Sequence, residues 1–161
     1  MINKEIFLSS LEHEIRVIRH LGKKITPDML EYRPSPTQRS LLELLQYLSY
    51  VLETSVEAVV KNDGSLYKTH SEMAQKTTLD NFDERMHQQT VHIREMIEEL
   101  SDEAMEEMVS LWVTQTRAMH FLNSTLKWSV AYKMQLFQYL KQGFNIPLTT
   151  SNLWAGMDPK E

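Results

Sequence analysis

The chain has 161 residues, which fits one domain and is long enough to bury a hydrophobic core. Its net charge of −5, without a basic run, argues against a nucleic-acid partner, and the absence of cysteine excludes disulfides, cysteine-ligated zinc and a thiol nucleophile. Only four glycines and five prolines favour helices over a turn-rich β fold. No run approaches the ~20 apolar residues of a membrane span, and the first ten residues lack the apolar stretch of a signal peptide, so we expect a cytoplasmic protein.

Helical periodicity begins close to the N-terminus. Apolar residues recur at helical spacing over residues 4–21 and predict a first long helix with Gly22 as its C-cap. Residues 26–28, Thr-Pro-Asp, predict a single helical turn. A second long helix is expected over residues 40–61, because Ser40-Leu-Leu-Glu43 has the form of a capping box ahead of a broad apolar face.

The second half of the chain predicts two more long helices. Residues 62–77 are polar and predict a surface connection that is long for a bundle. A third long helix is expected over residues 79–100, and a short helix over residues 101–109. The fourth long helix is expected over residues 115–142, with Gly143 as its end.

Four long amphipathic helices without a convincing strand predict an all-α fold, a four-helix bundle with long connections and short additional helices. Up-down-up-down connectivity is compatible with this pattern. One domain is expected to span residues 1–161. Its tail, about residues 144–161, is expected to pack on the bundle, since an exposed Trp154 would forfeit the free energy of its burial.

The six histidines are the first candidates for metal ligands, but their spacing favours solvated positions. His87 and His92 are five residues apart, which separates them by about 140° around a helix axis. The other four fall on polar helix faces or in the polar connection: His13, His20, His70 and His120. Arg16 and Lys23 share the polar face of the first helix with the first two of these.

Glu14 is the one carboxylate close to an apolar stripe, since it lies between Leu11 and Ile18 on the first helix. Two roles fit this position. It is either a pocket base with a raised pKa, or a boundary residue whose carboxylate reaches water or pairs with a cation. The second role is the commoner one.

Aromatic residues form a stripe beside the apolar face of the fourth helix: Phe121, Trp128, Tyr132 and Tyr139. Tyr47 flanks the apolar face of the second helix in the same way. The pattern fits rings that fill the seam of the bundle, which is the usual role of such stripes. It also fits rings that line a pocket or a subunit interface, and the sequence leaves both roles open.

Two segments resemble the DinB-like (DinB/YfiT) family of four-helix proteins. Residues 30–48, LEYRPSPTQRSLLELLQYL, resemble the family segment in which a proline-containing turn and a serine lead into the second helix. Residues 132–143, YKMQLFQYLKQG, are similar to the closing stretch of the fourth helix. Helix order and length agree over nearly the whole chain. The resemblance implies a four-helix bundle, homodimers and, in typical members, a divalent metal held by three histidines.

The resemblance places the three metal-binding positions at Tyr47, on the second helix, and at Trp128 and Tyr132, where the family has an HxxxH pair. None of the three is histidine in this chain. An indole offers only an N–H donor, and a phenol with a reference pKa of about 10 is neutral at pH 7. We therefore expect no metal, no cofactor and no catalytic residue at this site.

These observations predict a non-catalytic DinB-like protein whose metal pocket is replaced by aromatic residues. Its expected role is a small-molecule-binding or protein-interaction module, without nucleic-acid or membrane partners. A homodimer is expected to use apolar residues outside the main stripes: Phe121, Tyr139 and Trp154. The alternative is a metal-dependent transferase- or hydrolase-like enzyme of the DinB/YfiT superfamily with non-standard ligands, such as Glu14, Glu53 or a histidine outside the family positions.

Overall fold

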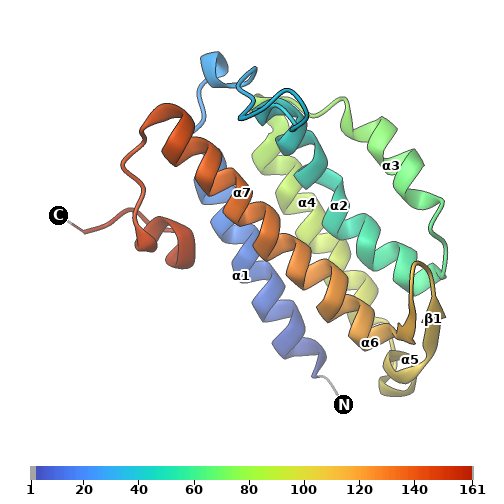
Figure 1. Cartoon of the computed structure of the whole chain (residues 1–161). Coiled ribbons are helices and arrows are strands. Elements are labelled where there is room, and N and C mark those ends of the chain that lie inside the picture. The colour runs from blue at the N-terminus through green and yellow to red at the C-terminus, as the bar shows by residue number, and fades with distance from the viewer. Residues whose placement is uncertain (1–2, 161) are drawn as a thin grey trace.

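The computed structural model describes residues 3–160 and has an all-α bundle at its centre (Figure 1). Its four long helices are α1 (Lys4–Gly22), α2 (Leu41–Lys61), α4 (Leu79–Glu98) and α7 (Lys127–Phe144). The helix α1 packs against α4 and α7, and α2 packs against the same two helices. The prediction of a four-helix bundle is confirmed.

The order of helix directions differs from the up-down-up-down arrangement. Contacts between α2 and α4 run from Ser49 with Thr77, just before α4, to Glu53 with His92, so these two helices are parallel. The ion pair of Arg19 with Asp83, in contrast, joins the end of α1 to the start of α4, so these are antiparallel. The chain therefore needs a return connection between α2 and α4, which α3 provides (Figure 1).

The start of α2 forms the capping box that the sequence predicts. The backbone N–H of Glu43 donates to the hydroxyl of Ser40, and the N–H of Ser40 donates to the carboxylate of Glu43. The helix ends at Lys61, and Asn62 takes the left-handed conformation with φ of 52°. Both bounds agree with the predicted helix because these caps satisfy backbone groups that the helix itself leaves unpaired.

The predicted connection over residues 62–77 is wrong in part, because it contains the helix α3 (Leu66–Ala74). This helix is mostly polar, and Ala74 is its only buried residue. It packs along α2, where a hydrogen bond of 2.6 Å joins His70 to Thr54, and its Tyr67 contacts Trp128 of α7. A polar helix of this kind gives little apolar periodicity from which to predict it.

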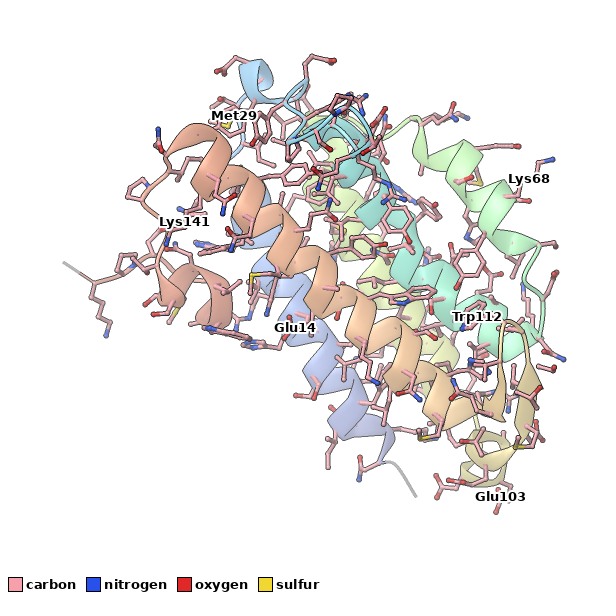
Figure 2. All side chains as sticks on the ribbon, in the orientation of Figure 1. Glu14, Met29, Lys68, Glu103, Trp112 and Lys141 are labelled. Carbon is pink, nitrogen blue, oxygen red and sulfur yellow. The ribbon has the colours of Figure 1, made fainter. Side chains whose placement is uncertain are left out.

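The short helix predicted over residues 101–109 ends early, at α5 (Asp102–Glu106). It is followed by an antiparallel hairpin, β1 (Met108–Ser110) and β2 (Thr114–Thr116), which the sequence did not predict. The hairpin lies at the end of the bundle, beside the last turn of α2 (Figure 1). Its tip presents Trp112, half of which is exposed to solvent (Figure 2).

The fourth long helix consists of three parts. It begins as α6 (Arg117–His120), continues as a π-helical segment, η2 (Phe121–Leu126), and becomes α7. Gly143 does not end it, contrary to the prediction, because the helix runs to Phe144 and is capped by Asn145 with φ of 53°. Gly143 instead provides room for Tyr32, since a Cβ at this position would lie 2.6 Å from the Cζ atom of that ring.

The inner face of the fourth helix is more polar than the predicted apolar face. Thr125, Ser129 and Lys133 recur every four residues along it and are fully buried. Phe121 begins this face and stacks on Phe7 with 5.4 Å between ring centroids, so it belongs to the core and not to an outer stripe. Over the first half of this helix, the face that is buried is therefore not the one that the sequence predicted.

The C-terminal segment packs on α1. It contains the single-turn π-helical segment η3 (Ser151–Ala155), in which Leu153 is buried. Arg16 donates to the backbone carbonyl of Ala155 over 2.7 Å, and Lys24 pairs with Asp158. Among residues 3–160, no helix combines the length and the apolar composition that crossing a membrane requires.

Candidate functional site

Tyr47 and Tyr132 meet at the position where the family resemblance places the metal. Their ring centroids are 4.7 Å apart in an edge arrangement, and Tyr50 packs against the other side of Tyr47 at 5.6 Å. The guanidinium carbon of Arg39 lies 4.0 Å from the centroid of Tyr47 and 6.0 Å from that of Tyr132. All three rings are half-buried, so they are neither closed core nor fully solvated.

Trp128, the third residue at the family's metal positions, contacts a different set of rings. It stacks on Trp112 of the hairpin at 5.5 Å and meets Tyr67 of α3 at 6.2 Å. Tyr67 and Trp112 also contact each other, at 5.8 Å. The three positions thus form two neighbouring aromatic groups, one around Tyr47 and one around Trp128, on the side of the bundle where α3 and the hairpin lie.

The chemistry of these side chains does not fit a divalent metal. Burial raises the pKa of Tyr47 well above its usual range, and the adjacent Tyr132 hydroxyl adds to this effect. Burial also raises the pKa of Tyr50, and that of Tyr67 to about 12. Phenols in this environment stay protonated at neutral pH, and an indole has no lone pair to offer in the ring plane. The side chains at these positions therefore do not provide the imidazole or carboxylate ligands that a divalent metal needs.

A surface cavity of about 240 Å³ opens beside Tyr47. It is lined by both charged and aromatic side chains: Arg39, Glu43, Gln46, Tyr47, Tyr50, Ser71, Ala74 and Gln75. The carboxylate of Glu43 accepts two hydrogen bonds from Arg33 and one from the backbone of Ser40, and its pKa is lowered mainly by Arg33. No carboxylate in the described part of the chain pairs with Arg39, so this guanidinium is the uncompensated charge of the cavity.

Glu14 takes the second of the two roles considered for it, because it pairs with a cation. Its Oε2 lies 2.5 Å from Nζ of Lys133, which is fully buried, and 13% of the Glu14 side chain is exposed. Trp154, from the tail, covers the ammonium group with its ring centroid 4.5 Å from Nζ. This ring is itself 53% exposed, so the tail docks without burying its largest side chain.

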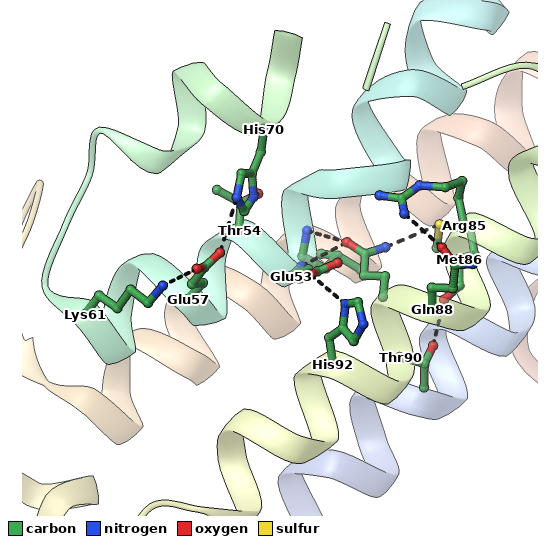
Figure 3. A network of polar contacts seen from close by, with 12 residues as sticks. Glu53, Thr54, Glu57, Lys61, His70, Arg85, Met86, Gln88, Thr90 and His92 are labelled. Atoms are coloured by element: carbon green, nitrogen blue, oxygen red, sulfur yellow. Dashed lines mark hydrogen bonds and ion pairs between the residues drawn. The ribbon is translucent and has the colours of Figure 1, made fainter. Parts of the chain in front are cut away.

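Two histidine–glutamate pairs lie farther along α2, one helical turn apart (Figure 3). His92 of α4 lies 2.9 Å from Glu53, and His70 of α3 lies 3.3 Å from Glu57. Glu53 and both histidines line a second cavity, of about 150 Å³. Among residues 3–160, however, no three His, Asp or Glu side chains are placed to hold one metal ion.

The prediction that all six histidines are solvated is wrong for His120 and His70, and His20 is also part-buried, with 17% of its side chain exposed. His120 is fully buried, where its Nε2 lies 3.1 Å from the carbonyl of Val109 and its ring packs against Trp112. His70 is part-buried on α3 and not in a loop. Both were misplaced because neither the hairpin that covers His120 nor the helix that carries His70 was predicted.

Neither a protein-family model nor a curated protein matches this sequence. The structure, however, is similar to the crystal structure of a DinB-like protein, YjoA, from Bacillus subtilis, with a TM-score of 0.72. The match covers 89% of this chain and 95% of that chain. This chain has the DinB-like fold. The two sequences are 18% identical, so the likeness shows the DinB-like fold alone and carries no site residue from one protein to the other.

Proposed function

We propose that this DinB-like chain is a non-catalytic binding module whose ligand is a small anion with a flat apolar body. The observation that carries the proposal is Arg39. Its guanidinium carbon lies 4.0 Å from the centroid of the Tyr47 ring, at the edge of the cavity, and the group has no carboxylate partner within residues 3–160. The N–H groups of a guanidinium lie in its plane and match a carboxylate in a bidentate arrangement.

The surroundings of Arg39 support a ligand of this kind. Tyr47 and Tyr50 offer apolar ring surface together with neutral hydroxyl groups, and Gln46 and Ser71 add polar atoms at the rim. The cavity volume of about 240 Å³ lies just below the usual range for ligand pockets, which favours a fragment-sized molecule. Because Arg33 already neutralises Glu43, that carboxylate does not repel an anion strongly.

Benzoate is a suitable probe, because it combines a carboxylate with a flat ring. We expect benzoate to bind with millimolar affinity and its neutral isostere benzamide to bind at least about tenfold more weakly, since benzamide lacks the charge-assisted pair with Arg39. Chemical-shift perturbation in NMR spectra measures both affinities. Arg39→Gln should abolish the difference between the two probes.

Two further variants control this experiment. Arg39→Lys keeps the charge but loses the planar guanidinium, and should weaken benzoate binding less than Arg39→Gln does. Lys68→Gln removes one positive charge from the exposed face of α3 and should leave binding unchanged. Equal binding of benzoate and benzamide, or full benzoate binding by Arg39→Gln, would contradict the proposal.

The enzyme alternative, a metal-dependent transferase or hydrolase, depends on ligands outside the family positions. Glu14 is engaged by Lys133, which leaves Glu53 with His92 as the pair nearest to such a role. Metal content of the purified protein decides this point. We expect less than about 0.1 equivalent of any transition metal per chain. A stoichiometric metal in the unaltered protein that is lost in Glu53→Gln would support the enzyme alternative.

A homodimer remains a prediction. The structure changes which apolar residues are exposed and can therefore form its interface. Phe121 and Tyr139 are buried within one chain, so of the three apolar residues expected at the interface only Trp154 is exposed. Exposed apolar side chains gather instead at the hairpin and after it: Met108, Trp112, Val113 and Met119. Sedimentation at micromolar concentration should give twice the chain mass of 18.9 kDa. A single species at the chain mass would contradict it.

A further inference from the structure

A third cavity, separate from the two described above, lies where the tail crosses the end of α1. It has a volume of about 240 Å³ and is lined by Arg16, Arg19, His20, Lys23 and Gly156. Arg19, His20 and Lys23, the C-cap of α1, follow Arg16 by three, four and seven residues, so all four lie on one face of the helix and its cap. All four carry ionisable nitrogen atoms, although the whole chain has a net charge of −5.

The positive charges of this face are only partly compensated. Arg19 forms a two-bonded ion pair with Asp83 of α4, with both distances at 2.8 Å. Asp158 of the tail pairs with Lys24, at the edge of the face. No carboxylate in residues 3–160 pairs with Arg16 or Lys23, and Lys23 is exposed. Within residues 3–160, this concave surface therefore has two cations without an ion-pair partner, although Lys23 is close enough to Asp83 to help Arg19 lower the pKa of that carboxylate.

The pKa of His20 reflects the same excess of positive charge in this cavity. Its pKa is lowered, first by burial and then by Lys24, with smaller contributions from Lys23 and Arg16, while Asp158 acts in the opposite direction. Three neighbouring cations thus disfavour a fourth charge on the ring. A bound anion would reduce this repulsion.

The tail distinguishes this cavity from an ordinary solvated helix face. Arg16 donates one N–H to the carbonyl of Ala155, and a second N of its guanidinium lies 3.0 Å from Nδ1 of His13, so the side chain is held in place. Gly156 forms the wall, with φ of +59°, and a Cβ there would lie 3.3 Å from the Arg16 guanidinium. A larger residue would therefore close the space that the glycine leaves open.

We propose that this cavity binds a phosphate group, through Arg16 and Lys23 with Arg19 at its side, and that the bound anion joins the tail to α1. A phosphate dianion supplies the two negative charges that the cavity lacks, and its oxygen atoms accept from guanidinium and ammonium donors at the same time. Free phosphate and a phosphomonoester share this chemistry. The site is separate from the one proposed around Arg39.

Calorimetric titration with inorganic phosphate, and separately with glycerol 3-phosphate, tests the proposal at constant ionic strength maintained with chloride. We expect millimolar or tighter binding of at least one of the two, and tighter binding of the ester would identify the source. Lys23→Gln, whose side chain makes no ion pair in the described chain, should weaken binding about tenfold, the loss of one charge-assisted contact. Arg16→Gln should weaken it at least as much.

Two controls make the result specific. Lys68→Gln makes the same change of charge on exposed α3, and Arg39→Gln removes the other proposed site; both should bind phosphate as the unaltered protein does. Asp158→Asn removes a competing negative charge and should tighten binding. The proposal is overturned if neither anion binds beyond the chloride control, or if Lys23→Gln and Arg16→Gln bind as tightly as Lys68→Gln.

Discussion

Lys133→Met should lower the free energy of unfolding by about 3–5 kcal/mol, which is the cost of leaving one member of a buried ion pair without its partner. The substitution keeps most of the side-chain volume but leaves the carboxylate of Glu14, 13% exposed, facing an apolar neighbour. It also removes the cation beneath Trp154. Urea denaturation at pH 7 measures the loss.

The double variant Glu14→Leu with Lys133→Met separates charge from packing. Replacing both members of a buried pair by apolar residues is often neutral or stabilising, so we expect the double variant to regain most of the stability that the single variant loses. Lys127→Met, on the exposed face of the same helix, should change stability by less than about 0.5 kcal/mol. A double variant as unstable as the single one would refute the assignment of the loss to the unpaired charge.

Gln89→Leu should cost about 2–3 kcal/mol of stability, because a fully buried amide joins α4 to the backbone of α2. Its Oε1 accepts from the N–H groups of Leu52 and Glu53, and its Nε2 donates to the carbonyl of Leu48. An apolar side chain of similar size fills the space but satisfies none of these backbone groups. Thermal and urea unfolding measure the effect.

Gln88→Leu provides the matched control, one residue earlier on α4. Gln88 bonds only to Arg85 and Glu84 of its own helix, so its loss should cost less than about 0.5 kcal/mol. If the two variants lose the same stability, the contacts of Gln89 with α2 do not contribute as the geometry indicates.

Local signals in the sequence were sufficient for the bounds of α1, α2 and α4 but not for the fourth long helix. The bounds of α2 follow from Ser40 and Glu43 at one end and a polar Asn-Asp-Gly segment, residues 62–64, at the other, and these signals act within one turn of the chain. The same holds for α1, whose apolar face repeats without interruption, although its C-cap is Lys23 and not the predicted Gly22. Elements with an apolar stripe and a defined cap can be predicted because the information is local.

The missed elements depend on tertiary contacts. The helix α3 has a single buried residue, and it forms because Tyr67 and His70 find partners on other elements. The hairpin is three residues long on each side and lacks a glycine-containing turn, so it carries none of the usual sequence signals. Contacts supplied by distant parts of the chain are not visible in a local pattern.

The candidate site could be predicted in part. The meeting of Tyr47 with Tyr132 agrees with the positions taken from the family resemblance, yet Arg39, which gives the cavity its charge, was not recognised. Lys133 was missed for a different reason. A lysine in a helical segment is normally assigned to solvent, and only the placement of Glu14 near an apolar stripe indicated that a cation would be buried opposite it.

The π-helical segment η2 also determines how residues of the fourth helix are to be compared with those of other proteins. A turn with hydrogen bonds from i to i+5 holds one residue more than an α-helical turn, and one residue corresponds to about 100° of rotation. The residues at steps of four from Phe121 to Lys133 therefore stay on the buried inner face, whereas an uninterrupted α-helix would rotate them by about 40° at each step. An alignment is reliable on either side of η2 but not across it, and a pair of ligands engineered onto one face should lie entirely within α7.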